Sequence, residues 1–239
     1  MRLKLFISWL LLALVACESH TSFPKIDSSG YYPIQKGSQW TYAVVETQFS
    51  PVTGQTTASY DLKVIVSDTL VASSGEVIYT LQRFRRVDDT QPYTATDTWS
   101  VRKSDFTVVV QQGNIPYLKL SLPLSAGKTW NGNAYNNLGG KDRCTDGTVN
   151  CDAYAVKALA QGFQLGTLSY KNTVTIEENS AQDPIVGQDV RTSVYAFGVG
   201  LVYYESNVFS YCTVGTCIGK QIVESGVAYK QTLKDYVAR

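Results

Sequence analysis

The number and the positions of histidine and cysteine residues limit the chemistry that this chain can carry out. The chain has 239 residues, with one His and five Cys. Its histidine, His20, follows Cys17 closely in a polar segment. A Ser-His-Asp triad, a Cys-His pair or a histidine-ligated metal needs an imidazole held inside a folded domain. We therefore predict a protein that is not an enzyme and that carries no cofactor, with a hydrolase that uses carboxylates alone as the alternative.

The first sixteen residues have the pattern of a secretory signal. Basic side chains at positions 2 and 4 accompany an apolar stretch over 3–15, which is too short to span a bilayer comfortably. The segment ends in Leu-Val-Ala-Cys at 14–17, which resembles the bacterial lipobox. The resemblance implies that Cys17 receives a diacylglycerol, that the peptide is cut before it, and that its new amino group is acylated.

Lipidation at Cys17 would determine where the protein resides. Several acyl chains hold a protein to a membrane far more firmly than one chain can. The next residue is Glu18 and not Asp, which in Gram-negative lipoproteins argues against retention at the inner membrane. We expect a signal peptide over 1–16, a flexible tether over 17–30 and a single domain over 31–239, anchored by lipid at the outer membrane.

Four cysteines remain for the exported domain: Cys144, Cys151, Cys212 and Cys217. An even number in an oxidising compartment predicts disulfides. Three pairings are open, and we favour the two local pairs, Cys144 with Cys151 and Cys212 with Cys217, because a Gly-containing turn separates the members of each. A four-cysteine zinc site is the alternative, but the spacings lack the usual two-residue knuckle.

The acidic residues near these motifs do not predict a metal site or a catalytic pair. Asp142, Asp146 and Asp152 lack the spacing of an EF-hand calcium loop, so we interpret them as solvated loop acids. Glu177 and Glu178 are neighbours that would point to opposite faces of a strand. They therefore do not predict the paired carboxylates of a glycosidase.

Arginine and tyrosine give two weaker signals. Arg83 and Arg85 share one face of a predicted strand, and we interpret that face as solvated. Sixteen tyrosines are present, and a tyrosine-lined cleft would suit a glycan or a lipid. A net charge of +1 provides no basic surface for nucleic acid.

The elements that must position these residues are short strands. The chain is 44% hydrophobic and 17% charged, which is typical of a globular domain. Alternation of apolar and polar residues predicts half-buried antiparallel strands. It is clearest at 60–66, 99–103, 106–110 and 190–196. Turn signals such as Ser50-Pro51, Asp183-Pro184 and Gly198 divide the chain into about a dozen such pieces.

The chain also repeats itself. Pro-Ile-x-x-Gly-x-x-Trp at 33–40 recurs ninety residues later as Pro-Leu-x-x-Gly-x-x-Trp at 123–130. A second match relates Tyr60 to Tyr154 at an offset of ninety-four. In the first motif the Gly permits a turn with positive φ, and the Trp opens a strand as a core anchor. A tryptophan platform for stacking sugars is the alternative interpretation.

These motifs carry a second resemblance. Tyr-Tyr-Pro-Ile at 31–34 leads into Gly37, Trp40 and Tyr42, and Tyr-Ala-Phe-Gly-Val-Gly-Leu-Val follows at 195–202. With the mid-chain repeat, this order is similar to that of a large group of uncharacterised bacterial envelope lipoproteins common among Bacteroidota. The resemblance implies an envelope location and a β architecture, and it brings no assigned chemistry.

We therefore predict an antiparallel all-β domain, a strongly curved sheet or half-barrel built from two related halves over 31–120 and 121–239, with a β-sandwich as the alternative. Two non-enzymatic functions follow. The concave face binds a hydrophobic or glycan ligand, or the domain is a structural or accessory subunit of an envelope complex. An apolar tunnel would favour the first function, and a flat aromatic patch the second. The expected partners are the membrane and one of these ligands or proteins, without nucleic acid.

Overall fold

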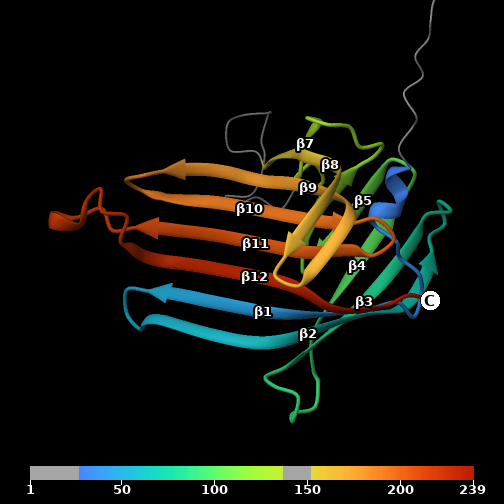
Figure 1. The fold of residues 1–239 in the computed structure, drawn as a ribbon, viewed down its shortest axis with the longest axis horizontal. Coiled ribbons are helices and arrows are strands. Elements are labelled where there is room, and N and C mark those ends of the chain that lie inside the picture. The colour runs from blue at the N-terminus through green and yellow to red at the C-terminus, as the bar shows by residue number, and fades with distance from the viewer. Residues whose placement is uncertain (1–26, 137–151) are drawn as a thin grey trace, which may run out of the picture.

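The computed structural model describes residues 27–136 and 152–239. They form one antiparallel sheet of twelve strands with two short 3₁₀ helices, η1 and η2 (Figure 1). The sheet curves until it is nearly closed, like a barrel. This confirms the predicted all-β class and the curved sheet, and it rules out the β-sandwich. No helix among the described residues is long and apolar enough to cross a membrane.

Each half of the chain supplies six strands. The first half contains η1 (Ser28–Tyr31), β1 (Gln39–Ser50), β2 (Gly54–Val71), β3 (Val77–Arg86), β4 (Thr94–Lys103), β5 (Thr107–Gln112) and β6 (Ile115–Ser121). The second contains β7 (Thr129–Asn131), β8 (Ala153–Leu165), β9 (Leu168–Asp183), β10 (Gly187–Ala196), β11 (Gly200–Tyr211), η2 (Gly215–Cys217) and β12 (Val223–Val237). The four stretches with the clearest alternation lie in β2 (60–66), in β4 (99–103), at the start of β5 (106–110) and in β10 (190–196). The turn signals at 50–51, 183–184 and 198 lie at strand ends or between strands.

The order of the strands brings the ends of the two halves together. The sheet runs β6-β5-β4-β3-β2-β1-β12-β11-β10-β9-β8-β7, so β1 pairs with β12 while β6 and β7 lie at its two edges. These edges meet, because the Leu118 N–H donates to the Gly132 carbonyl at 2.8 Å. The Trp130 indole N–H donates to the Leu118 carbonyl, also at 2.8 Å. The curvature therefore turns a linear sheet into an enclosure.

The ninety-residue repeat is visible in the backbone. The Gly37 N–H donates to the Val66 carbonyl at 2.8 Å, and the Gly127 N–H donates to the Val156 carbonyl at 3.1 Å. Both glycines have positive φ, +90° and +72°, where a side chain would strain the turn. Equivalent donors and acceptors are ninety residues apart in both cases, which supports the prediction of two related halves.

The second sequence match, at an offset of ninety-four, is wrong. Trp40 pairs with Val64, and Trp130 pairs with Tyr154, so Tyr154 is equivalent to Val64 and not to Tyr60. The physical reason is the two-residue period of a strand. A shift of four residues keeps every inward side chain on the inward face, so the alternating pattern cannot detect the slip.

The folded domain begins before residue 31. The η1 helix starts at Ser28, and the buried hydroxyl of Ser28 accepts a hydrogen bond from the Leu124 N–H at 2.8 Å. The Gly30 carbonyl accepts one from the Gly198 N–H at 2.8 Å. The predicted tether over 17–30 is thus too long at its C-terminal end. Ser28 and Gly30 form their hydrogen bonds with segments that are distant in the sequence. A local pattern of polar residues cannot indicate such contacts.

Candidate ligand cavity

The inward faces of both halves enclose a cavity of about 360 Å³. Its wall contains six tyrosines: Tyr32, Tyr42, Tyr60, Tyr195, Tyr204 and Tyr229. Trp40 and Trp99 add two larger aromatic surfaces. A concave space of this size with an aromatic wall is typical of small-molecule sites. The predicted tyrosine-lined cleft therefore exists, and it lies inside the sheet.

The motifs singled out in the sequence contribute to the wall of the cavity. The Trp40 indole N–H donates to the Val199 carbonyl at 2.7 Å, and the Tyr42 hydroxyl donates to the Leu201 carbonyl at 3.1 Å. These bonds attach the start of β1 to the β10–β11 turn. Trp40 is buried and stacks on Tyr236 with ring centroids 5.3 Å apart. Its predicted role as a core anchor is confirmed, and its indole is also part of the cavity wall.

Trp130, the repeat partner of Trp40, has a different environment. It is half-buried, does not line the cavity, and packs edge-on against Tyr154 with ring centroids 5.8 Å apart. Its indole N–H joins β7 to β6. The two tryptophans are thus equivalent in the backbone, but Trp130 holds the edges of the sheet together rather than filling its interior.

Part of the cavity wall is more exposed. Tyr60, Ser206 and Tyr229 are only partly buried. The Tyr60 hydroxyl donates to Glu46 Oε2 at 3.0 Å, and the Arg85 guanidinium lies 3.7 Å from the Tyr60 ring centroid. Burial and the Glu46 carboxylate raise the pKa of Tyr60 to about 12. The phenol therefore stays neutral at ordinary pH.

Arg83 does not lie on a solvated face, so that prediction is wrong. Its side chain is 11% exposed and lines the cavity. The guanidinium carbon lies 3.5 Å from the Trp99 ring centroid. Sequence alternation correctly placed Arg83 and Arg85 on one face but could not say which side of the sheet that face meets. Leu81, apolar and two residues earlier, was the available signal that the face points inward.

A buried ion pair lies beside the cavity. Lys119 Nζ on β6 is 2.8 and 3.0 Å from the two oxygens of Glu178 on β9, and the Tyr154 and Ser193 hydroxyls also donate to that carboxylate. Burial alone would raise the pKa of Glu178, but the charge and hydrogen bonds of Lys119 outweigh it and hold the pKa below its ordinary value. The carboxylate is ionised, and both of its oxygens accept hydrogen bonds. This suits a structural role in joining the edge strand β6 to β9.

The neighbouring glutamate behaves as predicted. Glu177 points away from Glu178 and forms a partly exposed ion pair with Lys157 at 3.1 Å. The two carboxylates thus lie on opposite faces and do not form a catalytic pair. Within the described residues, no group of three His, Cys, Asp or Glu side chains is placed to hold a metal ion.

Asp152 is not a solvated loop acid. It is buried, its carboxylate accepts from both terminal nitrogens of Arg191, one of them at 3.0 Å, and Asn133 Nδ2 donates to it at 3.0 Å. Asp152 comes directly before β8, while Arg191 comes from β10. Their sequence separation hid the pair from a local analysis. Asp142 and Asp146 lie outside the described residues.

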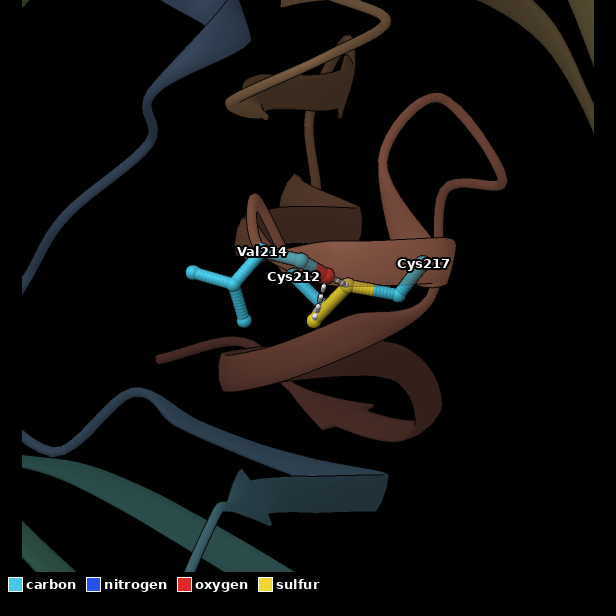
Figure 2. The surroundings of a disulfide bond; sticks show 3 residues. All are labelled: Cys212, Val214 and Cys217. Carbon is cyan, nitrogen blue, oxygen red and sulfur yellow. Dashed lines mark hydrogen bonds between the residues drawn. A yellow bond between two sulfur atoms is a disulfide. The ribbon is translucent and has the colours of Figure 1, made fainter.

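Cys212 and Cys217 form a disulfide with Cα atoms 5.8 Å apart (Figure 2). This confirms one of the two predicted local pairs. The bond closes the loop between β11 and β12, and the Val214 carbonyl oxygen lies 2.7 Å from Cys217 Sγ. It also consumes two of the thiolates that the alternative zinc site would need. Cys17, Cys144 and Cys151 lie outside the described residues, so the lipidation and the second pair stay predictions.

Fold and cavity together define an all-β protein whose nearly closed sheet surrounds an aromatic chamber. No protein-family model matches the chain, and no curated protein matches it. Two solved structures resemble it. One is a protein inferred to be exported, with a YmcC-like fold, from Bacteroides fragilis, at 12% identity and a TM-score of 0.45. The other is an inferred lipoprotein from Parabacteroides distasonis, at 10% identity and a TM-score of 0.35. Each comparison covers 87% of this chain and 98% of the other.

Proposed function

We propose that this protein is a lipid-anchored, non-enzymatic lipoprotein of the bacterial outer membrane that binds a hydrophobic small ligand inside its sheet. The observation that carries the proposal is the aromatic cavity of about 360 Å³. A concave aromatic cavity inside the sheet is what the ligand-binding function requires, whereas an accessory subunit of a complex would need only an outer surface. The lipobox at Cys17 supports the anchor and the location.

The wall favours an apolar ligand over a glycan. The indole N–H of Trp40 and the hydroxyl of Tyr42 donate to backbone carbonyls. The Tyr229 hydroxyl donates to Gln231 at 2.9 Å. These side chains therefore present mainly their apolar surfaces to the cavity. Leu62 and Leu81 extend this surface. A glycan buried here would lose many hydrogen bonds to water and would find few polar groups of the wall to replace them, which is costly.

Blocking the cavity should abolish binding of a neutral apolar probe. We expect decanol to bind the wild-type domain, and Ser206→Trp to weaken that binding by at least about tenfold, because Ser206 lines the cavity and an indole there would take up part of its volume. Isothermal titration calorimetry gives the affinities. Ser210→Trp, at an exposed site on the same strand, is the matched control and should bind like wild type. Equal decanol affinity in both variants, with unchanged melting temperatures, would contradict the proposal.

Removing the thiol of Cys17 should release the protein from the membrane. In Cys17→Ser cells we expect no incorporation of labelled palmitate and no mature protein in the outer-membrane fraction, because the acyl chains supply the attachment. Cys212→Ser removes a different cysteine and should still be labelled. Labelling of the Cys17→Ser protein at the wild-type level would refute the anchor.

A further inference from the structure

Arg83 is a cation with unused hydrogen-bond donors in the cavity wall. Its nearest carboxylate among the described residues is Asp97, whose side chain is 47% exposed and whose Oδ1 lies 3.7 Å from Arg83 Nη1. That distance is too long for a hydrogen bond. Arg83 Nε is buried and has no hydrogen-bond partner in the part of the chain that the structure describes. A buried charge is costly unless it is paired, so the donors of Arg83 are an unsatisfied feature of the site.

The other cation in the wall is already neutralised. Lys119 is bound by both oxygens of Glu178. The carboxylate beside Tyr60, Glu46, accepts hydrogen bonds from Tyr60 and from Gln48 at 2.8 Å. Of the two cations that line the cavity, Arg83 is therefore the one without a hydrogen-bonded carboxylate in the described part of the chain.

The surroundings of Arg83 divide into a polar spot and an apolar remainder. Its guanidinium carbon lies over the Trp99 ring, 3.5 Å from the centroid, and this cation–π contact holds the guanidinium against the indole. Leu62, Val64 and Leu81 line the cavity on the same pair of strands, β2 and β3. A guanidinium held in this way presents the fork of N–H groups that matches a carboxylate.

We propose that Arg83 is the anion-binding residue of the cavity and that the ligand is an amphiphile with one carboxylate on an apolar body. This inference rests on the proposed function and adds the class of ligand. One cation with unused hydrogen-bond donors matches a monoanion and leaves the second charge of a phosphate monoester unpaired. The small cavity and its apolar walls match a short acyl or aromatic body. The carboxylate of the ligand would thus contact Arg83, and its apolar body would contact the apolar part of the wall.

The first test needs no variant. Decanoate, decanol and decylammonium carry the same chain with a negative, neutral or positive head, and calorimetry on the wild-type domain gives their affinities. We expect decanoate to bind about tenfold to a hundredfold more tightly than decanol, because a charge-assisted hydrogen bond is added. Decylammonium should bind more weakly than decanol. Equal affinities for decanoate and decanol would overturn the role of Arg83.

The second test assigns the preference to a residue. Arg83→Gln should lose the preference for decanoate over decanol, whatever its affinity for decanol, while Arg83→Lys should retain part of that preference, because the charge stays and the fork is lost. Arg102→Gln is the matched control. Arg102 lies on the neighbouring strand β4, is 40% exposed and does not line the cavity. It should keep the full preference.

The outcomes separate this inference from the function on which it rests. If no decyl compound binds the wild type, the proposed function fails. If decanol and decanoate bind but Arg83→Gln keeps the preference for decanoate, only the assignment of Arg83 fails. Melting temperatures of the variants show whether each is folded, and a folded Arg83→Lys protein provides the readout if Arg83→Gln does not fold.

Discussion

Replacing Glu178 by Gln should lower the free energy of unfolding by about 3–5 kcal/mol, because the change leaves the ammonium group of Lys119 buried without its counter-charge. Glu178 is 1% exposed, so water cannot take over the role of the carboxylate. Urea unfolding measures the effect. Glu177→Gln is the matched control, since its pair with Lys157 is partly exposed and should be worth less than about 1 kcal/mol.

Two further measurements distinguish a buried pair from a general packing effect. The double change Lys119→Met with Glu178→Leu removes both charges and should recover most of the lost stability. The pKa of Glu178 is lowered in the folded state, so its contribution is present above the ordinary carboxyl pKa and is lost as the pH falls through the folded pKa. The difference in the free energy of unfolding between Glu178→Gln and wild type should therefore become smaller at acidic pH. An equal loss for Glu177→Gln and Glu178→Gln at neutral pH would refute the assignment.

Replacing Trp40 by Ala should also lower the free energy of unfolding by about 3–5 kcal/mol, since it removes a buried indole and leaves the Val199 carbonyl without its donor. Trp130→Ala should cost at least about 1 kcal/mol less, because Trp130 is only half-buried. Urea unfolding of the two variants gives the comparison. A Trp40→Ala domain within about 0.5 kcal/mol of wild type would contradict the role of Trp40 as a core anchor.

Local patterns predicted the strands and the turns well. The strand alternation over 190–196 and the Pro-x-x-x-Gly spacing before Trp40 both depend on residues a few positions apart in the sequence. The structure agrees with both. The same patterns failed to predict direction and register. Alternation placed Arg83 and Arg85 on one face, but it did not reveal that Arg83 points into the cavity. The internal repeat aligned Tyr60 with Tyr154 four residues out of register.

The tyrosine-lined cavity was predicted in outline from the sequence, but the buried ion pairs around it were not, because they depend on the curvature of the sheet. Lys119 and Glu178 are fifty-nine residues apart and meet because the edge strand β6 lies near β8 and β9 in the closed structure. Asp152 and Arg191 are thirty-nine residues apart. Single residues of these types are usually exposed, so their pairing becomes visible only in three dimensions.

A crystal structure of the domain grown with decanoate tests the central claim, ligand binding inside the sheet, most directly. We predict electron density for the decyl chain between Trp40 and Leu62, with the carboxylate accepting hydrogen bonds from the Arg83 guanidinium. Density confined to the outer surface, or side chains that fill the cavity and leave no room for the chain, would contradict it.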